Sequence, residues 1–86
     1  MAVVITKDTM FGLLGEHSFA FSIWANETHQ DSVAVKFMIE NVTEFDLEST
    51  LVQGVLLPLL LERGVIPQEV IDRINAYIIQ TKTPPV

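Results

Sequence analysis

Side chains that bind divalent metal ions occur at three alternate positions in one polar segment. Glu27, His29 and Asp31 offer carboxylate oxygens and an imidazole nitrogen, which are ligand types of protein metal sites. Alternate residues of an extended loop project to the same side, so these three side chains are candidate metal ligands. Polar residues are also typical of any loop that lies in water, and this simpler interpretation is preferred. We expect no bound cofactor.

The residues needed for nucleophilic catalysis are missing. The chain contains no cysteine, and its serines lie outside any Gly-x-Ser-x-Gly motif. Glu16, His17 and Ser18 are consecutive, so their side chains point in different directions in a helix or a strand. Gly12 and Gly15 form Gly-x-x-Gly without the lysine and hydroxyl residue of a phosphate-binding loop. We therefore expect a protein without enzymatic activity.

Acidic residues gather between Phe37 and Glu62, a stretch without lysine or arginine. The whole chain has 11 acidic and 5 basic residues, and its formal net charge is −6. This balance disfavours direct binding of nucleic acid, which depends on Lys and Arg contacts to phosphates. It favours a basic protein as the partner, although helix capping and solubility explain the same acidic residues. The predicted partner-binding residues are Glu40, Glu44, Asp46 and Glu48.

Three segments of the N-terminal half predict strands. Residues 2–6, AVVIT, are apolar and β-branched, as in a short strand. Residues 18–25 and 33–39 place large apolar side chains at alternate positions, and this period of two residues is that of a strand. The polar segment 26–31 lies between them, so the pair predicts a β-hairpin with a loop of about six residues.

The same segments also fit helices. In this alternative, residues 9–25 and 32–43 are helical, because several apolar residues fall near helical spacing. Residues 8–15 fit either a helical turn or a loop. Strands are preferred because the segments are rich in aromatic and β-branched residues and because glycines weaken the first helix. The residues near helical spacing are Met10, Leu14, Phe21 and Trp24.

A first C-terminal helix is predicted to start at Thr43 and to stop at Gly64. Thr43 and Asp46 have the spacing of a capping box, and Arg63 followed by Gly64 is typical of a helix end. Pro58 lies inside this helix, where it removes a hydrogen bond and clashes with the carbonyl group four residues back. A kink near Gly54 is therefore expected.

A second C-terminal helix is predicted over residues 68–80. Pro67 suits its first position, and apolar residues follow at helical spacing. Two prolines in residues 81–86 predict a loose tail beyond a single compact domain of residues 1–80. The apolar stripe consists of Val70, Ile71, Ile74, Tyr77 and Ile78.

The run GVLLPLLL, residues 54–61, is the most apolar part of the chain. It is too short for a bilayer, which needs about 20 apolar residues. A helical wheel places apolar residues on opposite sides, and a helix apolar all round is buried all round. One side, with Val52, Val55, Leu56, Leu59 and Leu60, is predicted to face the core. The other side, with Gly54, Leu57 and Leu61, is the predicted interface of a homo-oligomer, most simply a dimer.

These patterns predict an α+β fold, in which the N-terminal strand and the hairpin form a small antiparallel sheet followed by two helices. An all-α bundle is the alternative. The N-terminus has no secretory signal pattern, so we expect a cytoplasmic protein. The predicted function is a non-enzymatic, acidic interaction module that acts as an adaptor or as an inhibitor of a basic partner, for example one that binds nucleic acid. The alternative is a small-molecule or metal-binding protein that uses the hairpin loop.

Overall fold

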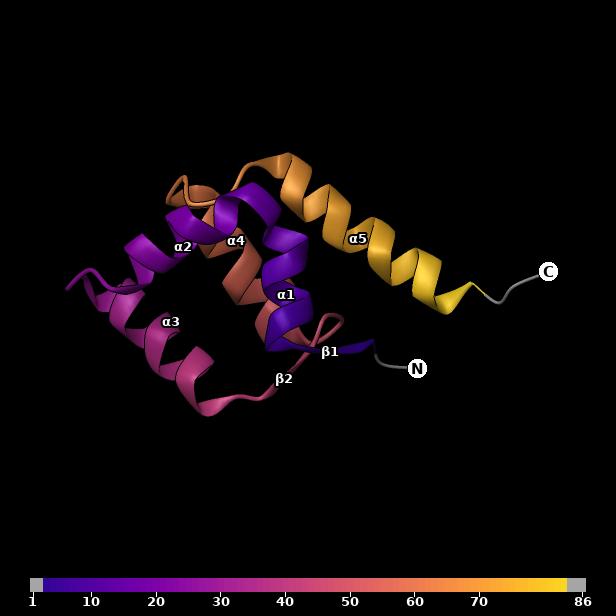
Figure 1. Ribbon diagram of the computed structural model, residues 1–86, viewed down its shortest axis with the longest axis horizontal. Coiled ribbons are helices and arrows are strands. Elements are labelled where there is room, and N and C mark those ends of the chain that lie inside the picture. The colour runs from indigo at the N-terminus through magenta and orange to yellow at the C-terminus, as the bar shows by residue number, and fades with distance from the viewer. Residues whose placement is uncertain (1–2, 84–86) are drawn as a thin grey trace.

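The computed structural model describes residues 3–83, which form mainly helices and one small sheet. Figure 1 shows α1, α2, α3 and α4 grouped together, while α5 runs from this group toward the C-terminus. The molecule is accordingly elongated, with extents of 48 × 25 × 21 Å. The elements in order are β1 (Val4–Thr6), α1 (Lys7–Leu14), the 3-10 turn η1 (Gly15–His17), α2 (Ser18–Ala25), α3 (Gln30–Asn41), β2 (Glu44–Asp46), the π-helical segment η2 (Leu51–Leu56), α4 (Leu57–Glu62) and α5 (Gln68–Lys82).

The sheet consists of β1 and β2, which pair in antiparallel register. Ile5 lies opposite Phe45, and both side chains are buried. The backbone N–H of Leu47 donates to the carbonyl oxygen of Val3 at 2.9 Å and extends the pairing. The predicted N-terminal strand is therefore confirmed for the described residues, but its partner is a segment far along the chain and not a hairpin.

The predicted hairpin is wrong, because residues 18–25 form α2 and residues 33–39 lie within α3. Phe21 is 4% exposed, whereas Phe19, on the same side of a hypothetical strand, is 74% exposed. The buried residues of α2 are Phe21 and Ala25, which are four positions apart, as on one side of a helix. The alternative prediction of helices in this region is confirmed. Helices with a small antiparallel sheet still agree with the α+β class in its broad sense.

The turn between α2 and α3 is held by a buried serine. Ser32 is fully buried, and its hydroxyl group donates to the carbonyl oxygens of Glu27 and His29, each at 2.9 Å. Helix α3 begins at Gln30, so the polar loop predicted over residues 26–31 is shorter in the structure. These two hydrogen bonds fix the loop backbone that carries the candidate metal ligands.

The predicted helix start at Thr43 is also wrong, because the following residues pair with β1 as β2. This pairing buries Phe45, and Leu47, the first residue after β2, is fully buried. The burial of these two side chains outweighs the local capping pattern. The helix starts later, where the hydroxyl oxygen of Ser49 accepts a hydrogen bond from the N–H of Val52 at 3.1 Å.

Pro58 is accommodated by a widened turn. Residues Leu51–Leu56 form a π-helical segment, in which the N–H of Leu57 donates to the carbonyl oxygen of Val52, five residues back. This segment includes Gly54, and both prolines and π-helical turns are sites of helix bending, so the kink expected near Gly54 stays a prediction. The widened turn also changes which residues face the core. The buried residues of η2 and α4 are Val52, Leu56, Leu57 and Leu60.

Because of the π-helical turn, two residues of this helix lie on other sides than predicted. Val55, predicted in the core, is 54% exposed. Leu57, predicted on the oligomer interface, is 2% exposed and belongs to the core of the single chain. A π-helical turn contains more residues than an α-helical turn, so a wheel drawn at the α-helical angle assigns these positions to the wrong sides.

The end of α4 and the start of α5 agree with the prediction. Gly64 has a positive φ of 73°, and the N–H groups of Gly64 and Val65 donate to carbonyl oxygens of the last helical turn. Pro67 caps α5, which continues to Lys82 and therefore includes the first residues of the predicted tail. The rest of that tail, residues 84–86, lies outside the described residues.

The helices and the small sheet share one hydrophobic core. Val70 and Ile74 of α5 are fully buried against it, and Phe11 of α1 contacts Phe21 of α2 with ring centroids 5.8 Å apart. Within residues 3–83, none of the helices combines the length and the apolar character that crossing a bilayer requires.

Candidate protein-binding groove

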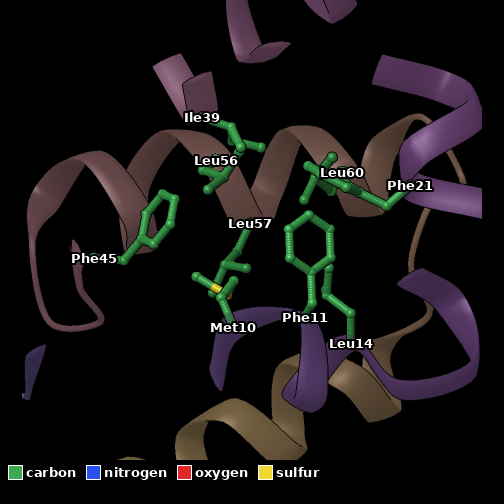
Figure 2. A pocket seen from close by; sticks show the side chains of 9 residues that line it. All are labelled: Met10, Phe11, Leu14, Phe21, Ile39, Phe45, Leu56, Leu57 and Leu60. Carbon is green, nitrogen blue, oxygen red and sulfur yellow. The ribbon is translucent and has the colours of Figure 1, made fainter. Parts of the chain in front are cut away.

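A small apolar pocket in the core is too small to be a candidate ligand site. It measures about 20 Å³, close to the space of one water molecule, and nine apolar side chains line it. Figure 2 shows Met10, Phe11 and Leu14 of α1 on one side and Leu56, Leu57 and Leu60 of η2 and α4 on the other. A cavity of this size with an apolar lining stays dry, so we interpret it as a packing defect of the core.

The candidate metal ligands of the α2–α3 turn enter two separate contacts. Glu27 Oε2 lies 3.2 Å from His29 Nε2. Asp31 Oδ2 instead accepts hydrogen bonds from Arg63 Nη2 at 2.6 Å and from Arg63 Nε at 3.1 Å. The arginine neutralises the Asp31 carboxylate and occupies its oxygen, which disfavours a cation bound by all three predicted ligands.

A different group of potential metal ligands lies at the other end of α2, where η1 meets the start of α5. Among residues 3–83, Glu16, His17 and Glu69 bring their ligand atoms within 4.8 Å of one another. The sequence did not indicate this group because Glu69 comes from α5, far along the chain. The two carboxylates are well exposed, and Arg73 Nη2 lies 4.0 Å from Glu69 Oε1. That positive charge opposes cation binding, so we assign no metal site here.

The four predicted partner-binding acids lie on α3, on β2 and in the turn after β2, and they differ in their contacts. Glu48 Oε2 pairs with Lys82 Nζ at 2.9 Å, and Asp46 Oδ1 accepts a hydrogen bond from the backbone N–H of Glu48 at 3.0 Å. These two carboxylates therefore have structural roles. Glu40, near the end of α3, and Glu44, on β2, are exposed to solvent.

The predicted interface residues do not share one surface. Gly54 and Leu61 are exposed, but Leu57 is buried between α4 and α1. Besides Leu61, the large apolar residues exposed in the same helical region are Leu51 and Val55.

Leu51 and Val55 line a groove between α3 and the η2–α4 segment. The volume of the groove is about 270 Å³, and its lining is almost entirely apolar. Asp31 contributes the one charged side chain of that lining. We call this hollow the apolar groove; its lining residues are Asp31, Ala34, Val35, Met38, Leu51, Val55, Leu56 and Leu59.

A polar hollow adjoins the apolar groove. It measures about 590 Å³ and contains the half-buried indole of Trp24. Asp31 lines both hollows, so they are neighbours on the surface. We call the second one the Trp24 hollow; its lining residues are Trp24, Glu27, His29, Gln30, Asp31 and Arg63.

Together the two hollows form a surface with an apolar part and a polar end that carries carboxylates. The sequence contains a signal for the apolar part: Ala34 and Met38 are four positions apart, as are Leu51, Val55 and Leu59. This signal could be used only after residues 30–41 were recognised as a helix.

Comparisons with known proteins found no match, whether with protein-family models, curated proteins or solved structures. The function must therefore be argued from the chemistry of this chain's own surface.

Proposed function

We propose that this chain is a non-enzymatic, acidic protein-interaction module that acts as an adaptor or as an inhibitor of a basic protein. The observation that carries the proposal is the number of large apolar side chains exposed on three consecutive helical segments. Exposed apolar side chains that adjoin one another are typical of protein interfaces, and Leu51 and Val55 line one hollow. The residues, each at least half exposed, are Phe19 and Ile23 of α2, Val33 and Phe37 of α3, and Leu51 and Val55 of η2.

The charge of the chain supports a basic partner. The formal net charge is −6, and Glu40 and Glu44 keep their carboxylates in solvent. Acidic surfaces accelerate association with basic surfaces and repel other acidic proteins. A protein that binds nucleic acid has a basic surface of this kind, and an acidic module bound there would compete with the phosphates.

We keep self-association as part of the proposal, but the interface differs from the one predicted from the sequence. A dimer that uses Leu57 would have to expose a core residue, so an interface between two copies would use exposed apolar residues instead. Sedimentation at micromolar concentration tests this directly, and a monomer would remove self-association from the proposal.

Metal or small-molecule binding in the α2–α3 turn is the second candidate. The Trp24 hollow and the contact between Glu27 and His29 favour it, whereas the Asp31–Arg63 pair opposes a metal ion. Calorimetric titration with zinc and manganese tests this candidate. Heat of binding at micromolar metal concentration that is absent in the His29→Ala variant would support metal binding.

The test of the interaction proposal is affinity capture with three forms of the full chain. We expect the wild type to retain a basic protein from its cells and to release it at high salt, because screening weakens charge contacts. Glu40→Lys/Glu44→Lys should retain much less, and Glu40→Gln/Glu44→Gln an intermediate amount. Both pairs change exposed side chains, so their melting temperatures should stay close to that of the wild type. Equal capture by all three forms would reject the charge-directed proposal.

A further inference from the structure

We infer that the apolar groove binds one amphipathic helix of the basic partner, and that the Trp24 hollow takes a lysine or arginine side chain of that helix. This inference rests on the proposed function and adds the place of contact and the form of the ligand.

The lining of the apolar groove is suited to a helix. Leu51, Val55 and Leu59 follow one another at intervals of four residues along η2 and α4 and form one edge of the groove. Ala34 and Met38 of α3 form the opposite edge, also four positions apart. Amphipathic helices bind such grooves through apolar anchors at i, i+3 or i+4, and i+7.

Buried residues form the floor between these two edges. Val35 of α3 and Leu56 of η2 line the groove and belong to the hydrophobic core. Leu51 and Val55 at the edge are at least half exposed. An apolar side chain inserted between the edges would thus meet a fixed apolar floor and remove exposed apolar surface from water, which is the favourable term in helix docking.

The Trp24 hollow has the chemistry of a site for a cation. Glu27 and Asp31 contribute two carboxylates and Arg63 one guanidinium group, so with neutral His29 the formal charge of the lining is −1. Arg63 is already bonded to Asp31, so the groups that remain for a ligand are the Glu27 carboxylate, which lies 3.2 Å from His29, and the half-buried indole of Trp24. A lysine or arginine side chain is attracted by both groups, whereas an anionic group would be repelled by the excess negative charge.

Charge also decides between occupants of the apolar groove. A second copy of this chain carries the same net charge of −6, so charge favours a basic occupant of this groove over a second copy. A helix with apolar anchors and basic flanks is attracted by the whole surface and matches the anionic end of the groove. We therefore commit to a basic amphipathic helix of another protein.

Trp24 is the single tryptophan of the chain, so its fluorescence reports on the hollow without any label. The probes are two synthetic peptides of about 15 residues, long enough for a helix on binding. Both carry leucines at i, i+4, i+7 and i+11; the remaining positions are mainly lysine in one peptide and mainly glutamate in the other. We expect a saturable change of Trp24 emission with the lysine peptide, and at least about tenfold weaker binding of the glutamate peptide.

Two matched pairs of variants locate the binding site. Val55→Lys places a positive charge at the groove edge, and Ile79→Lys makes the same change on α5, where the side chain is 66% exposed. We expect Val55→Lys to weaken the lysine peptide about tenfold or more, and Ile79→Lys less than about threefold. Glu27→Gln should weaken it several-fold, whereas Asp72→Asn on α5, with the same loss of charge at an exposed position, should have little effect. Circular dichroism must show that all four variants keep the wild-type helix content and melting temperature.

Four outcomes would overturn the inference. They are no saturable emission change with the lysine peptide at millimolar concentration, equal binding of the two peptides, equal effects of Val55→Lys and Ile79→Lys, and self-association that Val55→Lys abolishes. The last result would identify a second copy as the occupant. If a basic protein is still captured and only Glu40→Lys/Glu44→Lys releases it, the proposed function stands and the apolar groove fails; if nothing is captured either, both fail.

Discussion

The η2–α4 segment and the α2–α3 pair have similar apolar character but different positions in the fold. The first passes through the core and buries four aliphatic side chains. The second lies at one side of the molecule in Figure 1, where each helix buries two residues and exposes two large apolar ones. Apolar side chains therefore have two uses in this chain: the buried ones of the central segment stabilise the fold, and in our proposal the exposed ones of α2, α3 and η2 bind a partner.

Leu57→Gln tests the central segment and should have the largest effect. Leu57 is 2% exposed and lines the core cavity, so glutamine there loses apolar contacts and buries an amide without a partner. We expect a loss of about 3 to 5 kcal/mol in the free energy of unfolding, measured with urea.

The control for this substitution is Leu61→Gln on the same helix. Leu61 is 38% exposed, so we expect a loss below about 1 kcal/mol. If Leu57→Gln stayed as stable as the wild type while an oligomer dissociated, Leu57 would be an interface residue as the wheel indicated.

Ser32→Ala tests the turn that joins the peripheral pair. It removes the two hydrogen bonds to the carbonyl oxygens of Glu27 and His29 and leaves these acceptors less satisfied. We expect a loss of about 1 to 3 kcal/mol in the free energy of unfolding, together with a red shift of Trp24 emission as the hollow loosens. Ser22→Ala, on the exposed side of α2, is the control and should change neither quantity; equal effects of both would show that the turn does not depend on Ser32.

The parts of the fold that local signals determine were predictable. Gly64 ends α4 and Pro67 precedes α5 because their backbone preferences act wherever they occur. The apolar residues of the stripe that contains Val70 and Ile74 recur at helical spacing and not at alternate positions, so the stripe fits only a helix.

Helices α2 and α3 were not predictable, because contacts with distant parts of the chain and not local signals determine them. SFAFSIWA fits both a strand and a helix, and the outcome is decided by the contact of Phe21 with Phe11 of α1. Thr43 was misread in the same way, because the pairing of Ile5 with Phe45 overrides the capping pattern. The apolar groove requires both errors to be corrected first, since its edges come from α3 and from η2 in their true positions.

A pair of glycines beside the core separates backbone strain from helix propensity. Gly15 has a φ of 58°, and an added Cβ would lie 2.8 Å from Arg73 Nη1, which donates to the carbonyl oxygen of Leu13. Gly12 lies within α1 with nothing within 4 Å of an added Cβ. We expect Gly15→Ala to lose about 1 to 2 kcal/mol in the free energy of unfolding and Gly12→Ala to gain up to about 1 kcal/mol. Thermal melting measures both, and a stabilised Gly15→Ala would contradict the left-handed turn.

Lys82→Gln should have the smallest effect, because it removes a single ion pair on the surface. Lys82 Nζ and Glu48 Oε2 are 2.9 Å apart, but both side chains are partly exposed to water. Such pairs contribute about 0 to 1 kcal/mol, and this contribution falls with salt.

Removing a positive charge from a chain of net charge −6 also increases its general repulsion, and Lys7→Gln provides the matched control for that effect. Urea unfolding of both variants should therefore differ by less than about 1 kcal/mol at low salt and converge at about 1 M salt. A larger difference that persists at high salt would mean that the end of α5 is held by packing. The stabilising contacts would then extend beyond the central segment to the periphery of the molecule.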